Sequence, residues 1–348
     1  MKKSENQSSA FSASRLSDWE SAAREELQGA DPWNKLSKTI HGLSIKPYYV
    51  RSEGTEGANQ LPPSEDPFLG PRRWYNCPRV VVHQAESANK QALEHLQQGA
   101  DGVLFDLEKD VSLDQLIEGI DWPSCSLNFL SRNDVGSISR QLSAYIRRIK
   151  QPTPGALFGF AGFAEESVPT FRINGHVLPA LPSPADCVAQ GIEGLLARLG
   201  PSWKQQAGSA AFVVQIGEDF FVEIAKVRAL RLVWEKLLSK NGIQSSTYVH
   251  ALSMPFSNPA YSPQGNMIKS TTAAMASILG GCDALTLEPE TADDVTMSRV
   301  ARNVSNILRE ESHFSQVADA LAGSYFIEDL VKQISEASWS LLKQKNLV

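Results

Sequence analysis

The sequence predicts an α/β protein built as a (β/α)8 TIM barrel, preceded by an N-terminal helical/extended arm. Eight short apolar runs recur from residue 79 onward, and amphipathic stretches separate most of them. Strands that alternate with helices indicate a parallel sheet, and eight is the number that closes into a barrel. An open doubly wound sheet is the alternative, which the absence of a G-x-G-x-x-G motif after a first strand weakens.

Each apolar run is short enough for a buried strand. The eight expected strands are RVVVHQ (79–84), DGVLFDL (101–107), CSLNFL (125–130), GALFGF (155–160), TFRING (170–175), AAFVVQIG (210–217), STYVHALS (246–253) and CDALTLEP (282–289). Apolar residues at helical spacing predict helices within 88–96, 113–120, 138–149, 188–199, 220–238, 267–279 and 293–311. The gap over 161–169 is too short and too rich in Gly and Pro for a helix.

The segment before the barrel has a different composition. Residues 1–14 are polar and predict a disordered tail, and residues 15–78 predict an arm and linker. Within the arm, SRLSDWESAAREELQG predicts a helix that ends at Gly29. Residues 52–73 are rich in Gly, Pro, Ser and Glu, which predicts an exposed loop. Residues 79–348 are then the barrel with a C-terminal helix.

Composition excludes several classes of function. The chain has 348 residues and a formal net charge of −6, with no basic run, which argues against nucleic acid as a partner. No apolar stretch reaches the roughly 18 residues that a membrane helix needs, and the N-terminus lacks the apolar core of a signal peptide. The four cysteines are far apart, so we expect no metal site and no disulfide framework. These features predict a cytoplasmic protein.

Barrel sites form where strands end and the following loops begin. The polar residues at those ends include Asn174 and His176 after strand five, Gln215 on strand six, and His250 and Ser253 on strand seven. Asp106, Glu218 and Asp219 precede helices, so they are interpreted as helix caps or first-turn charges. His176 is interpreted as loop surface, and His250 as either a core histidine or a site residue. Spacing alone therefore predicts a barrel with few site residues and no assigned reaction.

Four stretches of the chain resemble the methylmalonyl-CoA mutase family. They are DWESAAREELQGADPWNKLSKTIHGLSIKPYYV (18–50), IGEDFFVEIAKVRALRLVWEKL (216–237), NMIKSTTAAMASILGGCDALTLEP (266–289) and SRVARNVSNILREESHFSQVADALAGSYFIEDL (298–330). The resemblance implies a (β/α)8 barrel through which coenzyme A threads, with a cobalamin-binding domain in catalytic chains. It also implies a radical rearrangement between methylmalonyl-CoA and succinyl-CoA, with adenosylcobalamin as the radical source.

This sequence departs from the family pattern at the catalytic positions. Catalytic chains carry Gly-Tyr-His after strand five, where this chain has Gly175, His176 and Val177, followed by Leu-Pro-Ala. The position of the histidine that hydrogen-bonds the thioester carbonyl is therefore a valine. The resemblance also implies an arginine that holds the substrate carboxylate, but no arginine lies between Lys150 and Arg172. His250 matches a family histidine, whereas the glutamine two residues on has become Leu252.

The cobalt-ligating pattern Asp-x-His-x-x-Gly also does not occur in this sequence. Together these departures resemble the small, non-catalytic subunit of heterodimeric bacterial mutases. The resemblance then implies no catalytic residue, no cofactor or metal bound by this chain, and no cobalamin-binding domain in it. Adenosylcobalamin is expected in the partner, a catalytic large subunit. The candidate remnants of a pocket are Asn174, His176, Val177, Gln215, His250 and Ser253.

Several alternatives stay open from the sequence. One is a catalytic mutase barrel that uses a separate cobalamin-binding chain, and another is a different barrel that binds coenzyme A thioesters. A homodimer in isolation also stays open. The arm carries Trp19, Trp33, Tyr48 and Tyr49, and exposed aromatic side chains mark contact surfaces, so we expect the arm to pack across a subunit boundary. The competing interpretation is that the arm folds over its own barrel.

Overall fold

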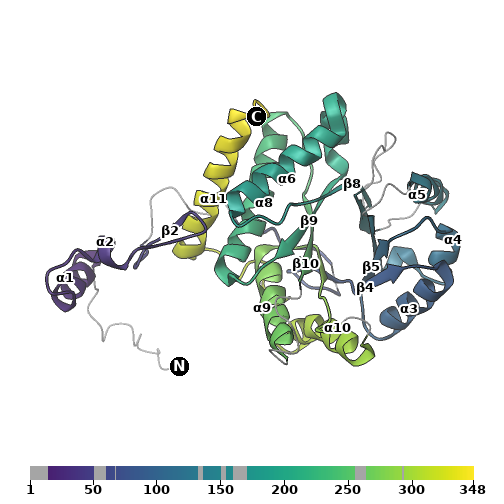
Figure 1. The fold of residues 1–348 in the computed structure, drawn as a ribbon, viewed down its shortest axis with the longest axis horizontal. Helices are drawn as coiled ribbons and strands as arrows, with labels where there is room; N and C mark the ends of the chain where they lie inside the picture. Colours follow the sequence, from purple (N-terminus) through teal and green to yellow (C-terminus); the bar gives the residue numbers. More distant parts are fainter. Residues whose placement is uncertain are drawn as a thin grey trace, which may run out of the picture. The chain divides into compact units, whose positions relative to one another are not determined.

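A computed structural model describes residues 15–50, 60–66, 68–131, 136–149, 154–159, 171–254, 264–291 and 294–348. The chain divides after residue 56 into two compact units (Figure 1). The predicted tail over residues 1–14 lies outside the described residues. No helix among the described residues is long and apolar enough to cross a membrane.

The first unit contains the predicted arm helix and a short hairpin. Its elements are α1 (Leu16–Glu26), α2 (Pro32–Leu36), β1 (Lys38–Ile40) and β2 (Leu43–Ile45). Asp31 caps α2 through its carboxylate, which accepts from the Asn34 backbone N–H at 3.3 Å. Trp19 stacks on Tyr48 and meets Trp33 edge-on, each with ring centroids 5.1 Å apart. These three predicted contact residues therefore pack on one another within the arm.

The second unit contains a nine-stranded sheet in which every neighbouring pair is parallel. Its strands are β3 (Tyr75–Asn76), β4 (Arg79–Val82), β5 (Gly102–Leu107), β6 (Ser126–Ser131), β7 (Gly155–Phe158), β8 (Phe171–Val177), β9 (Ala210–Ile216), β10 (Tyr248–Ser253) and β11 (Ala284–Thr286). The order in the sheet is β3-β11-β10-β9-β8-β7-β6-β5-β4. All eight predicted strands are present, which confirms the barrel-like α/β fold.

The ninth strand arises because the first barrel strand is divided at Cys77-Pro78. Its first half, β3, pairs with β11, and the Cys77 N–H donates to the Leu285 carbonyl at 2.9 Å. Its second half, β4, pairs with β5, and the Leu104 N–H donates to the Pro78 carbonyl at 2.9 Å. The strand therefore closes the sheet at its N-terminal half. Beyond Pro78 no strand pairing joins β4 to β11 among the described residues, so a slit separates the two strands there.

Helices cover the outer side of the curved sheet (Figure 1). They are α3 (Ala85–Gln97), α4 (Leu113–Leu116), α5 (Gly136–Ile149), α6 (Pro184–Leu199), α7 (Trp203–Gln206), α8 (Phe220–Lys240), α9 (Gly265–Gly280), α10 (Val295–Glu310) and α11 (Tyr325–Gln344). Three 3-10 turns lie at Trp122–Ser124, Gly200–Ser202 and Ala207–Ser209. The second predicted helix is shorter than expected, and the stretch after strand four lies outside the described residues.

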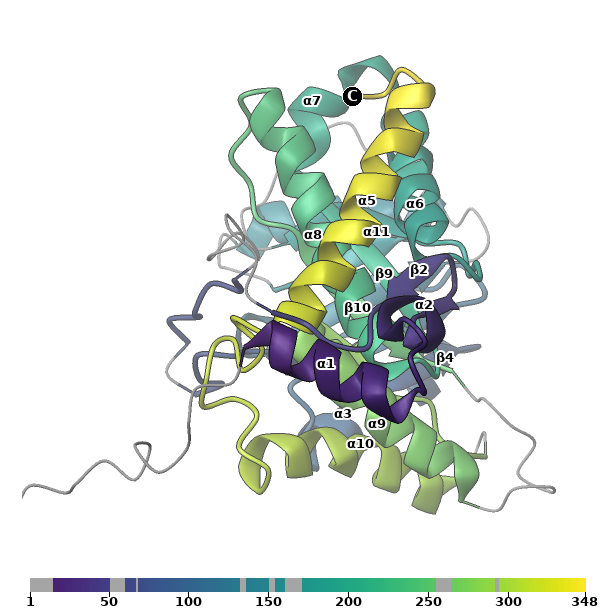
Figure 2. The same cartoon turned by 90° about the vertical axis from the view of Figure 1, so that its left-hand side faces the viewer.

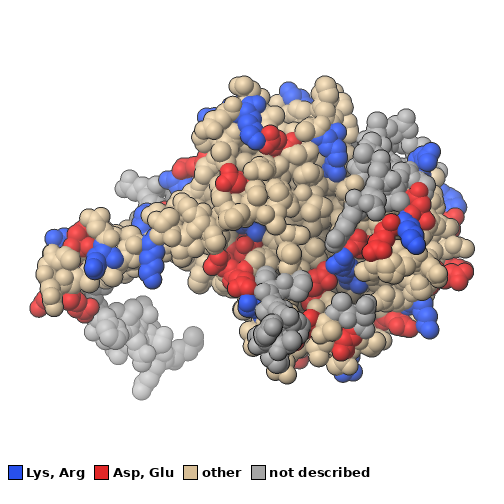
Figure 3. All heavy atoms as spheres, in the orientation of Figure 1, with Lys and Arg blue, Asp and Glu red and all other residues tan. Residues whose placement is uncertain are grey.

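Helix α11 packs along α6 and α8 (Figure 2). The Ser338 hydroxyl on α11 donates to the Ala185 carbonyl on α6 at 3.0 Å, which fixes one helix against the other. On the face seen in Figure 3, basic and acidic side chains of the described residues are interspersed, and no broad basic surface is present.

The segment predicted as an exposed linker is anchored to the barrel at two residues of its second half. Leu61 and Arg72 are both buried, whereas most of the described residues between them are exposed or partly exposed. The Arg72 N–H donates to the Ser315 carbonyl at 3.1 Å, and its guanidinium donates to the Cys282 carbonyl at 2.9 Å. The prediction was wrong at these two residues because the Gly, Pro and Ser content of the segment gave no sign that they would pack on the barrel.

Candidate functional site

The inner face of the barrel is filled by apolar side chains. One buried cluster contains Cys77, Leu104, Leu130, Ala156, Phe158, Ala211, Val213, Tyr248, Leu252 and Ala284. Nine of these residues come from six strands, and Cys77 lies at the break between β3 and β4. Alternate positions of each strand point to opposite sides. Their neighbours along the strands, such as Phe105 and Phe129, belong to a second cluster beneath the outer helices. The lumen is therefore a packed core, as it is in many small barrels.

Contacts reach across the lumen from opposite strands. The Tyr248 hydroxyl on β10 donates to the Asn128 side-chain carbonyl on β6 at 3.0 Å. The Phe158 ring on β7 meets the His250 ring on β10 edge-on, with centroids 5.8 Å apart. All four side chains are buried. Side chains thus join the two walls of the barrel directly.

His250 is a core histidine. Its side chain has no exposed surface, and its Nε2 lies 2.8 Å from the Thr286 hydroxyl. That hydroxyl donates its own proton to the Cys77 carbonyl, so Nε2 of His250 carries the proton and donates to Thr286. Its Nδ1 has no hydrogen-bond partner. Burial lowers the pKa of His250 to about 3, and the ring is therefore neutral.

His176 points away from the lumen. Its ring lies against Gly194 of α6, where a Cβ atom would stand 2.6 Å from Nε2. Burial and the nearby Arg198 lower the pKa of His176 to about 4. The next residue, Val177, is packed on the inner cluster instead. The side chain that faces the lumen at the end of strand five is therefore the valine.

The other three candidates lie at separate places. The Asn174 amide donates to the Ser209 hydroxyl at 2.6 Å and is aligned with the start of β9. The Ser253 hydroxyl accepts from the Glu288 N–H at 2.9 Å. Gln215 is partly buried on the same face of β9 as Val213. Of the six candidates, only Val177, Gln215 and His250 thus lie on lumen-facing positions, and they form no cluster of ionisable groups.

The C-terminal end of the lumen holds an ion-pair group that the sequence did not predict. Arg79 on β4 donates to Glu288 after β11 at 2.8 Å, and also to Asp106 on β5. Burial alone lowers the pKa of Arg79, but Glu288 and Asp106 outweigh that effect and raise it overall. The interpretation of Asp106 as a helix cap was wrong. A carboxylate inside the apolar run DGVLFDL was the available signal, because a buried charge needs a partner.

The two other acidic residues lie near the start of α8. Glu218 forms an ion pair with Lys269 at 2.6 Å. Asp219 is the N-cap residue of α8, but its side chain makes no capping hydrogen bond. Only Asp219 therefore occupies the predicted capping position, and it does so without the capping contact. Among the described residues, no three His, Cys, Asp or Glu side chains are placed to hold a metal ion.

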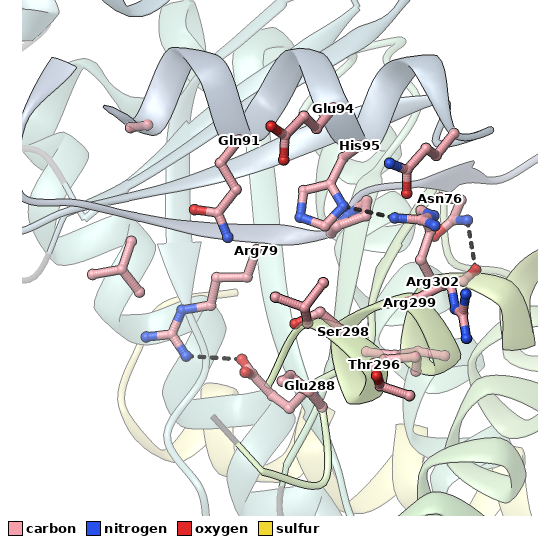
Figure 4. A pocket seen from close by; sticks show the side chains of 18 of the residues that line it. Asn76, Arg79, Gln91, Glu94, His95, Glu288, Thr296, Ser298, Arg299 and Arg302 are labelled. Atoms are coloured by element: carbon pink, nitrogen blue, oxygen red, sulfur yellow. Dashed lines mark hydrogen bonds and ion pairs between the residues drawn. The ribbon is translucent and has the colours of Figure 1, made fainter. Parts of the chain in front are cut away.

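The slit between β4 and β11 opens into a cavity of about 860 Å³ (Figure 4). Residues of α3, β4 and α10 line it, including Arg79, His95, Glu288, Arg299 and Arg302. His95 on α3 and Arg302 on α10 face each other across it, with the Arg302 Nη1 atom 3.1 Å from the His95 Nδ1 atom. Sequence spacing did not single out these two residues because they lie 207 positions apart.

Comparisons with known proteins give one consistent family. A family model described as methylmalonyl-CoA mutase matches residues 193–346. The methylmalonyl-CoA mutase small subunit of Porphyromonas gingivalis is 26% identical over 93% of this chain and 61% of its own length. The methylmalonyl-CoA mutase small subunit of Streptomyces virginiae is 34% identical over 36% of this chain and 21% of its own.

The match extends to mutases that are not named as small subunits. The methylmalonyl-CoA mutase of Cereibacter sphaeroides is 27% identical over 94% of this chain and 58% of its own length. The chain thus spans about three-fifths of the length of the relatives that it matches from end to end.

Proposed function

Because the chain belongs to the methylmalonyl-CoA mutase family, we propose that it is a non-catalytic small subunit that supports a catalytic large chain. The reaction of the assembled enzyme is then the interconversion of methylmalonyl-CoA and succinyl-CoA. In this proposal the described barrel is a scaffold whose outer surface and arm contact the large chain. The naming of two relatives as small subunits supports such a partner.

The packed lumen is the observation that carries this proposal. A coenzyme A chain running through the barrel needs an open path along the axis. Here Phe158, Leu130 and Leu252 are 0%, 6% and 7% exposed and belong to the same buried cluster. A Cβ on Gly175 would stand 2.3 Å from the Phe158 ring, which shows how closely this ring packs on strand five. The residues present therefore do not fit a threaded coenzyme A.

The family chemistry requires a hydrogen-bond donor for the thioester and an arginine for the substrate carboxylate. At the positions expected from the family, the described lumen offers neither group. Val177 faces the inner cluster and offers no hydrogen-bond donor. Arg172 cannot hold a substrate carboxylate, because its guanidinium donates to the Gly208 carbonyl and to the Ser246 hydroxyl at 3.0 Å. Both contacts lie before the N-terminal ends of β9 and β10, at the opposite end of the barrel from the expected site.

Adenosylcobalamin belongs, in this proposal, to the partner. When bound, this cofactor supplies the radical that starts the rearrangement. Two of the histidines near the strand ends are not suited to hold it, because His250 is enclosed in the core and the His176 ring lies against α6. That this chain contributes no cobalt ligand stays an expectation from the sequence.

The test is co-expression of the full chain with a catalytic large subunit of the family. We expect a complex of one copy of each on sizing chromatography, with mutase turnover in the complex and none in this chain supplied with adenosylcobalamin alone. His250→Gln in this chain should change the turnover of the complex by less than about tenfold, or 1.4 kcal/mol of barrier. Turnover by the isolated chain, or a thousandfold loss in the variant, would place catalysis in this barrel.

A second measurement separates the proposal from a coenzyme A binding barrel. Calorimetry of the isolated chain with coenzyme A should give no saturable heat, because the axis is filled. Saturable binding that is strengthened by Phe158→Ala would instead identify a barrel that still admits the thioester. Failure to co-purify with any catalytic large chain would refute the scaffold role.

A further inference from the structure

We propose that the cavity between α3 and α10 is a binding site for a small phosphate group, carried by inorganic phosphate or by a hydroxyl-rich phosphomonoester. Arg302 and Arg299 of α10 would hold its oxygens. The site lies at the slit and is separate from the filled lumen. The inference does not rest on the pairing of this chain with a large subunit.

Arg302 is a buried cation without an anionic partner among the described residues. It is 6% exposed, and its Nη1 bonds to the Nδ1 of His95 at 3.1 Å. Its Nε has no hydrogen-bond partner, and no carboxylate of the described residues lies within 4.0 Å of its guanidinium. Placing an unpaired charge in the interior is costly, and proteins normally pair it. Burial accordingly lowers the pKa of Arg302.

Two of the other three buried arginines among the described residues show what is missing, whereas Arg72 donates to backbone carbonyls. Arg309 lies on the same helix and forms two hydrogen bonds with Asp101, at 2.6 and 3.0 Å. Arg228 on α8 forms two with Asp319, also at 2.6 and 3.0 Å. Guanidinium groups bind carboxylates and phosphates in this forked manner. Arg302 has the burial of these residues but not the oxyanion.

His95 does not supply the missing negative charge. Arginine is always a donor, so the Nδ1 of His95 must accept, and its proton resides on Nε2. Burial and the neighbouring Arg302 lower the pKa of His95 to about 4, so the ring is neutral at physiological pH. His95 is therefore a neutral support for Arg302 and offers its Nε2–H as a donor.

Arg299 adds a second positive charge to the same cavity. It lines the cavity one helical turn before Arg302, is exposed, and forms no ion pair with a described residue. Its charge lowers the pKa of Arg302 further. Like charges at this spacing repel each other on a helix. Two adjacent guanidinium groups are thus more stable with a dianion between them than alone.

The remaining residues that line the cavity restrict the chemical class of the ligand. Glu288 is already bound to Arg79, and Glu108 to His83 at 2.9 Å, whereas Glu94 has no such partner among the described residues. A free carboxylate favours a ligand with hydroxyl donors over a bare polyanion. No Phe, Tyr or Trp lines the cavity, so a nucleobase would find no ring to stack on. These features fit a sugar-phosphate-like molecule better than a nucleotide.

The helix N-terminus is not the binding element. Asp294 already caps α10 by accepting from the Thr296 and Met297 N–H groups at 2.7 and 3.0 Å. An anion at that position would meet the Asp294 carboxylate. The proposed contacts are therefore the side chains of Arg299 and Arg302, farther along the helix.

Isothermal titration calorimetry of the full chain tests the proposal, with inorganic phosphate and glycerol 3-phosphate as probes at an ionic strength held constant with sodium chloride. We expect saturable binding of both, with glycerol 3-phosphate the tighter. Arg299→Gln should weaken binding about tenfold, since one charge-assisted contact is lost. Arg302→Gln should weaken it further. Arg148→Gln removes an exposed arginine paired with Asp114 elsewhere and should leave affinity unchanged.

Arg299 keeps the test decisive even if the buried Arg302 variant folds poorly, because its side chain is exposed and unpaired among described residues. The absence of saturable heat with both probes would overturn the proposal. Equal affinity in wild type and Arg299→Gln would do the same. None of these outcomes depends on whether a mutase complex forms, so failure here leaves the scaffold role untouched.

Discussion

The lumen of the barrel and the cavity at its slit differ in whether their buried polar and charged side chains have partners in the protein. In the lumen, His250 is neutral, Tyr248 and Asn128 bond to each other, and apolar rings occupy the axis. At the slit, Arg302 is 6% exposed and carries a charge that no described carboxylate balances. The barrel axis is thus filled by side chains, as is usual for this fold class, and the unpaired charge lies outside it.

The difference shows that a packed region and a binding region can be distinguished by whether their buried polar groups have hydrogen-bond or ion-pair partners. Most polar groups in the lumen find partners inside the protein, although the Nδ1 of His250 and the Nε of Arg79 do not. A neutral imidazole nitrogen left without a partner costs far less than an unpaired guanidinium. The lumen is therefore stable without a ligand, whereas the slit gains from one. Three measurements of stability can break or sharpen this contrast.

The largest effect is expected from Phe158→Ala. Removing a fully buried ring from the lumen should lower the free energy of unfolding by about 3–5 kcal/mol. Val295→Ala, at an 84% exposed residue lining the slit cavity, is the control and should change it by less than about 0.5 kcal/mol. Urea denaturation measures both. If Phe158→Ala costs as little as the control, the lumen is not a packed core.

The second effect compares two arginines at the slit. Arg79→Gln leaves Asp106 and Glu288 facing each other without their cation and should cost about 2–4 kcal/mol. Arg302→Gln removes a charge that has no anionic partner and should change stability by less than about 1 kcal/mol in buffer without phosphate. Both are read from urea midpoints. A larger loss for Arg302→Gln than for Arg79→Gln would mean that Arg302 has an anionic partner in the protein.

The smallest expected effect is the contribution of His250 to the pH dependence of stability. The pKa of His250 is about 3 in the folded state, against about 6.5 in an unfolded chain. The unfolded state therefore binds more protons below pH 6.5, and stability falls as pH falls from there toward pH 3. Between pH 7.5 and 5.5, His250 should account for a loss of about 1.4 kcal/mol. His250→Gln keeps a donor for Thr286 and should remove that share.

His95 provides the matched comparison at the slit, because its pKa is also lowered, to about 4. In phosphate-free buffer, His95→Gln should remove a similar share of the stability that the protein loses between pH 7.5 and 5.5. Denaturation curves recorded at the two pH values separate these variants from wild type. An unchanged pH dependence in His250→Gln would show that this histidine titrates normally in the folded protein.

The regular part of the fold was predictable because it depends on local patterns. Each predicted strand is an apolar run between amphipathic stretches, and such runs carry their own signal. The split of the first strand was not predicted, although Cys77-Pro78 contains its cause. Pro78 has no N–H to donate, but the sequence does not say which neighbour each half would pair with.

The candidate site was less predictable for a different reason. Position along a strand places a residue near the C-terminal end of the barrel. It does not say whether the side chain faces the lumen or the outer helices. His176 was a candidate because of its place in the chain, and the structure turns it to α6 while Val177 faces inward. The Arg302–His95 contact joins residues far apart in sequence and obeys no motif, so only the assembled fold reveals it.

The divided first strand also determines when the sheet can be completed. Its first half bonds to a strand near the end of the sheet's sequence, with Cys77 and Thr286 in contact across 209 positions. During synthesis, β4 can pair with β5 early, whereas the edge of β3 waits until β11 has emerged. Contacts of such sequence separation form slowly, and an unpaired edge promotes aggregation in the meantime. We therefore expect closure of the sheet to be a late step in the folding of this chain.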